Sequence, residues 1–162
     1  MKQSEELRVL IVIGGVTIYT NKEENYVRFT GNLDVCTDGT GSSHGDPHYQ
    51  QQTAYYNGGK FLNADKDFYI VVPPQVRRMV RPVVMGCQAK LTRISTKQSH
   101  DAVTGEIGPP NKTGEAAICL ARWLNSGVNA RIGDSKRDYI YELWPGVPAR
   151  VRDKTYKLEP AR

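Results

Sequence analysis

GEIGPPNKTGEAAICLARWLN, residues 105–125, holds the clearest local signals for the fold in this chain of 162 residues. Apolar side chains recur near helical spacing over Ala116–Asn125, which predicts a helix, and Gly127 follows as a stop signal. Glu115 stands directly before this run, where the free N–H groups of a first helical turn favour a carboxylate. Thr113 is then the candidate N-cap. The stretch therefore predicts one helix, entered from a loop that two consecutive prolines stiffen.

The rest of the chain has the pattern of β structure. Short runs rich in β-branched and aromatic residues are separated by Gly, Pro and polar turns. Two polar segments, residues 36–52 and 95–113, are expected to be long loops, and long loops in compact domains tend to carry function. The pattern predicts a mainly-β domain with a single central helix packed on the sheet. The expected strands are Leu10–Ile13, Val16–Tyr19, Tyr26–Phe29, Thr53–Tyr56, Phe68–Val72, Arg81–Met85, Ala89–Ile94 and Tyr139–Trp144.

The length of the chain suits one domain with a buried core. We expect this domain to span residues 1–152 and a basic C-terminal tail to span residues 153–162. The longest apolar run, residues 9–19, is too short to cross a bilayer, so no membrane span is expected. Acidic residues before that run, and the lack of a small-residue cleavage site after it, argue against a signal peptide. We therefore expect synthesis in the cytoplasm without one.

The formal net charge of +5 is unevenly distributed along the chain. From Gly31 to Ile70 five aspartates oppose two lysines, which gives −5 + 2 = −3. From Gln75 to Lys97 there are six basic residues and no acidic one. Such asymmetry fits either an anionic partner on one face or an ordinary solvated surface. No RNA-binding or helix-turn-helix signature accompanies it, so nucleic acid is not an expected partner.

Two glutamates carry the candidate chemistry. Glu106 and Glu115 flank the proline-stiffened loop, and a stiff loop suits a pair of positioned carboxylates. Hydrolysis of a glycosidic bond needs two such groups, one to protonate the leaving oxygen and one to activate water or attack the sugar. The competing interpretation is that Glu106 is simply solvated and that Glu115 only begins the helix.

The loop at residues 36–52 raises the question of a metal. It contains Asp38, Asp46, His44 and His48. The spacing lacks the closing Glu of an EF-hand, and the histidines lack the helical register of H-E-x-x-H. We expect these residues to form turns, with some of them lining a polar cleft, and we expect neither a metal nor a cofactor.

The passages PVVMGCQAKLT (82–92) and TGEIGPPNKTGEAAICLARWL (104–124) resemble the fungal-type chitosanases of glycoside hydrolase family 75. The family motif G-P-x-x-K-x-G-E-A is present as Gly108-Pro109, Lys112 and Gly114-Glu115-Ala116. Further family segments are similar, in the same order, to LDVCTDG (33–39), to residues 53–55 and to LNADKDFYIVVPP (62–74). The resemblance covers about residues 31–125, with weaker agreement as far as residue 152.

The resemblance implies a six-stranded, double-psi-like β-barrel with an active cleft across one face. It also implies an inverting hydrolase of β-1,4-linked glucosamine polymers such as chitosan. The net charge of +5 and the expected lack of a signal peptide add a peptidoglycan-type polymer as an alternative substrate, because a basic protein approaches an anionic cell wall favourably. The two essential acids of the family correspond to Glu106 and Glu115, and the family usually has Asp at the first of these positions. The candidate substrate-binding residues are Asp34 and Asp38 for amino groups, Tyr55 as a stacking platform, and Lys112 of the motif.

A second interpretation is a non-catalytic relative that serves as a structural or binding component, for example of a phage particle. Cys87 and Ala117 stand where the family has an acid and a serine, which favours this interpretation. The intact G-P-x-x-K-x-G-E motif favours the enzyme. The enzyme interpretation implies release to the cell wall. The second implies association with a virion through a protein-assembly partner.

Overall fold

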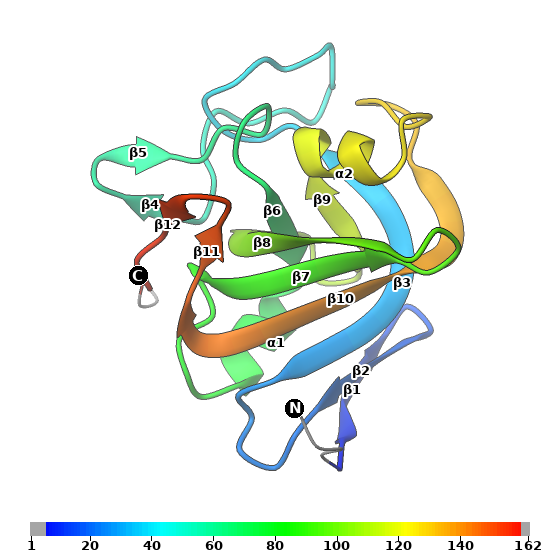
Figure 1. The fold of residues 1–162 in the computed structure, drawn as a ribbon, viewed down its shortest axis with the longest axis vertical. Helices are drawn as coiled ribbons and strands as arrows, with labels where there is room; N and C mark the ends of the chain where they lie inside the picture. The colour runs from blue at the N-terminus through cyan, green and yellow to red at the C-terminus, as the bar shows by residue number, and fades with distance from the viewer. Residues whose placement is uncertain (1–5, 160–162) are drawn as a thin grey trace.

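The computed structural model describes residues 6–159, and its main body is a closed six-stranded β-barrel (Figure 1). This confirms the predicted mainly-β, double-psi-like barrel. Two neighbouring pairs, β3–β9 and β6–β8, are parallel, and the remaining barrel pairings are antiparallel. Around the barrel the strands follow the order β3 (Val27–Cys36), β10 (Asp134–Pro148), β7 (Cys87–Arg93), β8 (Gln98–Ile107), β6 (Tyr69–Val72) and β9 (Glu115–Ala117), which pairs again with β3.

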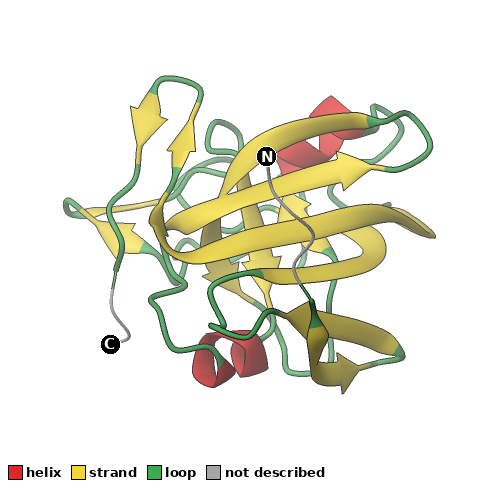
Figure 2. Cartoon of the chain, turned by 60° about the horizontal axis from the view of Figure 1, so that its bottom comes forward, coloured by secondary structure: helices red, strands yellow, loops and turns green. Residues whose placement is uncertain are grey.

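Smaller elements surround the barrel. A hairpin at the N-terminal end pairs with β3 and extends the sheet beyond the closed barrel. The two helices of the described residues lie towards opposite ends of the barrel (Figures 1 and 2). These elements are β1 (Arg8–Ile13) and β2 (Val16–Thr20) of the hairpin, β4 (Tyr56–Asn57), β5 (Lys60–Phe61), α1 (Pro74–Met79), α2 (Ile118–Leu124), β11 (Arg150–Val151) and β12 (Lys154–Thr155).

Alternating side chains fill the barrel interior. Along β3, alternate residues from Val27 to Leu33 are buried, while Arg28, Thr30 and Asn32 between them are more exposed, as the period of two in a strand requires. Tyr141 on β10 lies opposite Phe29, and the two rings stack with centroids 4.9 Å apart. The hydroxyl of Tyr141 donates to the carbonyl of Asn32, so the polar end of this buried ring is satisfied.

The expectation of a single helix that begins at Ala116 was wrong. Residues Glu115–Ala117 form strand β9, and α2 begins only at Ile118. Ala116 pairs with Val35 of β3 and with Ile70 of β6, so pairing with strands distant in sequence overrides a weak local helix preference. The sequence interpretation also missed α1, which begins with a proline at a first-turn position where proline is tolerated.

Three further expectations about the strands were wrong. Thr53–Tyr56 was expected to be a strand, but only Tyr56 belongs to one, the two-residue β4. Residues 95–113 were expected to be a loop, but Gln98–Ile107 is a long barrel strand. Its residues 102–106 are all buried, so β8 lacks the alternation that identifies a half-exposed strand. The segment Arg81–Met85, expected to be a strand, is irregular, whereas residues 37–52 form the predicted loop.

The segment expected to be a basic tail packs against the barrel over its described part. Tyr156 is buried, and its hydroxyl donates to Asp67 at 2.7 Å. The ammonium of Lys154 lies 2.7 Å from the same carboxylate oxygen. The backbone N–H of Glu159 donates to the carbonyl of Met85. Residues 160–162 of the expected tail lie outside the described residues.

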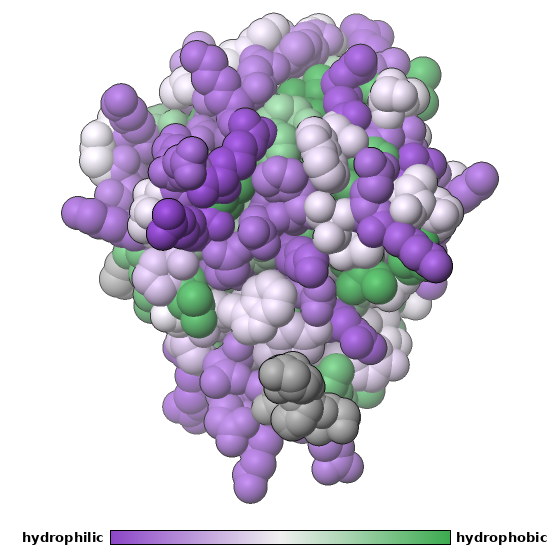
Figure 3. All heavy atoms as spheres, in the orientation of Figure 1, coloured by the Kyte–Doolittle hydropathy of each residue, from purple (hydrophilic) through white to green (hydrophobic). Residues whose placement is uncertain are grey.

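The outer surface is largely hydrophilic on the face drawn in Figure 3, with apolar side chains scattered among polar ones. Among residues 6–159, neither helix has the length and the apolar composition that crossing a bilayer would need.

Candidate active site

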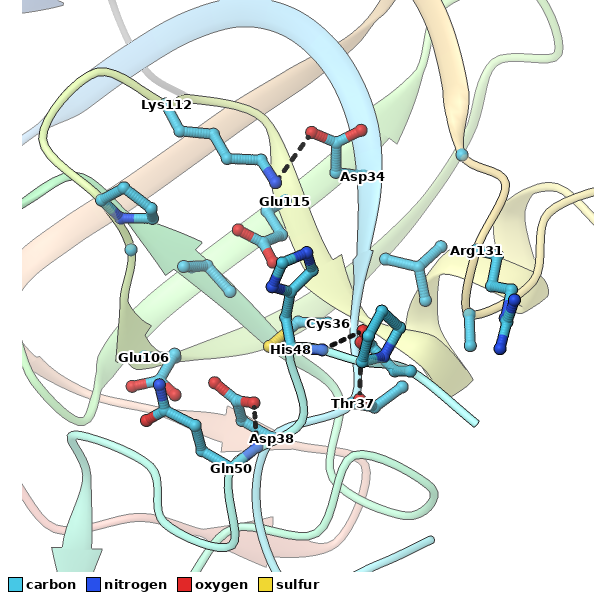
Figure 4. A pocket seen from close by; sticks show the side chains of 18 of the residues that line it. Asp34, Cys36, Thr37, Asp38, His48, Gln50, Glu106, Lys112, Glu115 and Arg131 are labelled. Atoms are coloured by element: carbon cyan, nitrogen blue, oxygen red, sulfur yellow. Dashed lines mark hydrogen bonds and ion pairs between the residues drawn. The ribbon is translucent and has the colours of Figure 1, made fainter. Parts of the chain in front are cut away.

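A cavity of about 810 Å³ opens at one end of the barrel (Figure 4). Its walls come from β3, from the ends of β8 and β9, from the loop at residues 37–52 and from residues 129–133. The loop is fixed over the cavity because Tyr49 donates to the carbonyls of Gly39 and Gly41, and Thr37 donates to Asp46. The size is within the range of small-molecule sites in proteins.

Glu106 and Glu115 lie on either side of one residue of β6. Val71 is the register partner of Glu106 on β8 and also of Glu115 on β9. Neighbouring strands are about 4.8 Å apart, so two strand spacings separate the α-carbons of the two glutamates by about 10 Å. Both glutamates line the cavity. The barrel thus brings the two predicted acids to one site. Both acids are positioned by strands, and Glu115 does not begin a helix.

A bulge in β8 sets the direction of Glu106. Ile70 pairs with Thr104 and Val71 pairs with Glu106, so Gly105 has no partner on β6. A β-carbon on Gly105 would overlap the buried side chain of Leu62, which explains the glycine. Bulges commonly re-aim a side chain beside an active site. Gly105 therefore lets Glu106 face the cavity where a regular strand would turn it away.

Glu106 is a buried carboxyl with an acidic neighbour. Its Oε1 accepts backbone hydrogen bonds from Ala54 at 2.8 Å and from Ile107 at 3.1 Å. Asp38 faces it across the cavity (Figure 4) and shares a side-chain hydrogen bond with it. Burial, and next the hydrogen bond and negative charge of Asp38, raise the pKa of Glu106 to about 8 against the two backbone donors. Glu106 is therefore mostly protonated at neutral pH.

Glu115 is less buried and has a cation nearby. Withdrawal from water raises its pKa to about 7; Lys112 opposes this shift, and Asp34, Asp38 and Asp46 add to it. A β-carbon on Gly108 would lie 3.6 Å from a carboxylate oxygen of Glu115, so this glycine leaves room beside the acid. Near neutral pH Glu115 therefore gains and loses a proton readily.

The cavity is acidic although the protein is basic overall. Lys112 lies 3.3 Å from Asp34, and this ion pair is more than one third exposed on both sides. Arg131 is directed outward and donates to the carbonyl of Gly45. The carboxyls of the cavity wall outnumber its permanent cations. The carboxyls are those of Asp34, Asp38, Asp46, Glu106 and Glu115, and the cations are those of Lys112 and Arg131. A cavity of this composition attracts cationic groups.

Four other residues were expected in the site, and the structure places three of them in the cavity wall. Asp34, Asp38 and Lys112 join the two glutamates in the cavity wall, as expected. Tyr55, expected to be a sugar-stacking platform, does not. It is 4% exposed, and its hydroxyl donates to the carbonyl of Lys157 at 2.9 Å. Its backbone N–H donates to Gly105, which turns the ring into the core under the C-terminal segment.

The sequence interpretation did not assign several residues of the wall a role in the site. Asp46 and His48 belong to the loop of which some residues were expected to line a polar cleft, but neither was given a role in the candidate site; the composition of that loop was the signal that could have found them. Arg131 and Asn129 come from a segment that gave no signal, because only the fold brings it to the cavity. The residues not assigned are Cys36, Thr37, Asp46, His48, Gln50, Asn129 and Arg131.

One group in the wall has the donor atoms of a metal site. The ligand atoms of Cys36, Asp38 and Glu106 lie within 4.8 Å of one another. Burial raises the pKa of the Cys36 thiol, and Glu106 also holds its proton at neutral pH. A metal ion would have to displace both protons before these residues could bind it.

The chain was compared with models of protein families and with the sequences of curated proteins, and neither comparison gave a match.

Proposed function

We propose that the protein is a glycoside hydrolase that cleaves a β-1,4-linked amino-sugar polymer, of the chitosan or peptidoglycan type, by inversion. We propose also that it is a divergent relative of the family 75 chitosanases. One observation carries the proposal: two glutamates, on the strands that flank β6, face one acidic cavity with pKa values raised to about 8 and about 7. Raised pKa values in a cleft are typical of groups that transfer protons.

The order of the two pKa values supports a separate role for each acid. Glu106 keeps its proton longer and is the general acid, which protonates the glycosidic oxygen as its bond to C1 breaks. Glu115 loses its proton first and is the general base, which takes a proton from the water that attacks C1. The products are two shorter chains, and the pair returns to its starting state after one proton passes from Glu115 to Glu106 through solvent.

The spacing of the two strands supports inversion. Inverting enzymes hold their carboxyls about 6.5–9.5 Å apart to leave room for water, and retaining enzymes hold them about 5–5.5 Å apart. The α-carbon separation of about 10 Å, with both side chains directed into one cavity, fits the wider spacing.

The charge of the cavity supports a substrate with free amino groups. The protein as a whole carries +5 and repels a polycation at long range, but the excess of carboxyls in the wall attracts an ammonium group at short range. Asp34 and Asp46 are the partly exposed acids that such a group would meet at the sides of the glutamate pair.

A reducing-end assay on chitosan and on purified peptidoglycan tests the proposal. Wild type should release reducing ends, while Glu106→Gln and Glu115→Gln should each lose at least a hundredfold in kcat because general acid–base catalysis contributes about 10²–10⁴. Glu23→Gln is the matched control, since Glu23 is exposed and lies outside the cavity wall. NMR of the first-formed product should show the α-anomer. Activity that survives both cavity substitutions would contradict the assignment.

The buried thiol at position 87 favours a second candidate function. Cys87 is fully buried and donates to Thr104 at 3.3 Å, where the chitosanase pattern has an acid. A non-catalytic binding component, for example of a phage particle, does not need that acid. Binding of an amino-sugar polymer by wild type without release of reducing ends from any polymer would favour this candidate.

A further inference from the structure

A second, smaller hollow lies next to the acidic cavity, on the other side of the Asp34–Lys112 ion pair. It has a volume of about 280 Å³ and shares only these two residues with the first cavity. Its other walls are the turn of the β1–β2 hairpin, the start of β10 and the loop before β9. The hairpin does not belong to the closed barrel, so an added element forms this hollow.

The chemistry of the second hollow differs from that of the first. Lys112 and Arg137 oppose a single acid, Asp34, which leaves an excess of one positive charge. Arg137 is fixed because its guanidinium donates to the carbonyls of Gly15 at 3.1 Å and Gly14 at 3.5 Å. Amide and hydroxyl groups supply the rest of the polar wall, from Asn32, Asn111, Thr113 and Ser135.

We infer that the second hollow is a subsite for the next sugar unit of the polymer, and that it prefers an N-acetylated unit to one with a free amino group. The inference rests on the proposed function of the main cavity. An acetamido group is uncharged and both donates and accepts hydrogen bonds, which suits amide and hydroxyl walls. An ammonium group would meet the positive excess of Lys112 and Arg137 in a partly enclosed space.

The two cavities together imply selection of the bond to be cleaved. The acidic cavity favours a free amine beside the glutamates, and the neighbouring hollow favours an acetylated unit one step along the chain. The exposed Asp34–Lys112 pair lies between them, and an exposed pair of this kind separates at little expense in free energy when a sugar ring crosses it. The expected substrate is therefore a partially N-acetylated polymer.

Mass spectrometry of the products from a half-acetylated chitosan tests this inference. Wild type should yield fragments in which one position near the cleaved bond is enriched at least threefold in N-acetylated units. Ser135→Trp fills the hollow from an exposed position and should abolish the enrichment while cleavage continues. Arg137→Gln should reduce it. Lys136→Gln is the matched control, because it removes an exposed charge from the adjacent residue, which does not line the hollow.

The outcomes separate this inference from the proposed function. Cleavage by wild type with no enrichment, or the same enrichment in Ser135→Trp as in Lys136→Gln, overturns the subsite and leaves the hydrolase in place. Calorimetric titration of Glu115→Gln with acetylated and deacetylated glucosamine tetramers gives a readout without turnover. If neither tetramer binds and wild type cleaves no polymer, both the subsite and the proposed function are overturned.

Discussion

At the scale of single residues, the environment of Glu106 is the feature on which the chemistry depends. Its two backbone donors alone would favour the ionised form, yet burial and the facing Asp38 outweigh them. The folded protein therefore holds a proton on Glu106 that the unfolded chain releases near pH 4.5. Such a group destabilises the fold as the pH rises, which is a common property of catalytic acids.

Glu106→Gln should be more stable than wild type at neutral and alkaline pH. Below about pH 4.5 residue 106 is protonated in both the folded and the unfolded wild type. Its ionisation then contributes nothing to the difference in stability between wild type and Glu106→Gln. Between about 4.5 and 8 only the unfolded chain ionises it, so the stability of wild type falls as the pH rises. The melting temperature of Glu106→Gln minus that of wild type should grow by several degrees over this range and level off above it. Glu23→Gln should show no such trend, and an equal trend in both variants would contradict the explanation.

The pH profile of kcat/KM tests the effect of Asp38 on the pKa of Glu106. Wild type should show a bell with limbs near pH 7, for loss of a proton from Glu115, and near pH 8, for loss of a proton from Glu106. Asp38→Asn removes the charge that raises the pKa of Glu106, so the alkaline limb should move to lower pH. Because Asp38 also adds to the raised pKa of Glu115, the acidic limb should move the same way by less. An alkaline limb that does not move would show that Asp38 does not raise the pKa of Glu106.

At the scale of elements, the bulge in β8 and the short strand β9 build the site. β9 has only three residues, but it pairs on both sides, with β3 and with β6, and so closes the barrel. Gly114 precedes it with φ of +83°, a conformation that glycine adopts without strain, and the carbonyl of Gly114 accepts from the N–H of Asp34. The position of each acid depends on backbone geometry that the glycine directly before it permits.

Gly105→Ala should impair both stability and catalysis. The added β-carbon would overlap Leu62 and press on Tyr69, so we expect a loss of about 1–3 kcal/mol of stability. A shift of Glu106 by about 1 Å would lower kcat by up to about a hundredfold. Chemical denaturation and reducing-end assays measure the two effects.

The double variant Gly105→Ala/Leu62→Ala gives the control for this prediction. Leu62→Ala alone should cost about 2–5 kcal/mol because it leaves a cavity in the core. In the double variant the new methyl group occupies part of that cavity, so the loss should be smaller than the sum of the two single losses. Strict additivity would mean that Leu62 is not what excludes a side chain at position 105.

At the scale of the whole molecule, an acidic cavity lies within a basic protein. The cavity wall holds five carboxyls and two basic side chains, so the rest of the chain, with 20 basic and 12 acidic residues, carries a larger positive charge than the net charge of +5. The long-range field and the local field at the site therefore have opposite signs. Salt screens the two differently, since the Debye length falls from about 30 Å at 0.01 M to about 8 Å at 0.15 M.

The value of kcat/KM for chitosan should therefore rise severalfold when the ionic strength increases from 0.01 to 0.15 M. Screening removes the long-range repulsion between the polymer and the net charge of +5, while contacts within the cavity are screened much less. Initial rates at low substrate concentration measure this ratio. A fully N-acetylated, uncharged oligomer is the control and should show no dependence on salt. A steady fall for chitosan over the same range would contradict the expected balance of charges.

Part of the fold and part of the site followed from local patterns. Turn signals and β-branched runs predicted a mainly-β domain. The β1, β2, β6 and β7 regions were located closely, whereas only the middle of β10 was found. Asp34, Asp38 and Lys112 were expected beside Glu106 and Glu115, and they line the same cavity. β8 could not be found in this way, because most of its cavity end is buried on both faces and the expected alternation is missing.

By itself the sequence determined the mainly-β class and the loop that covers the cavity, because composition and turn signals encode these directly, and the family resemblance made Glu106 and Glu115 a candidate pair. Only the tertiary structure decided that Glu115 lies on a strand, that Tyr55 is buried, and that Asp38 lies beside Glu106 and raises its pKa. Each of these depends on contacts between residues far apart in the chain, such as Val71 with both acids. The pKa values of the two glutamates depend in the same way on how much water the closed barrel removes from them.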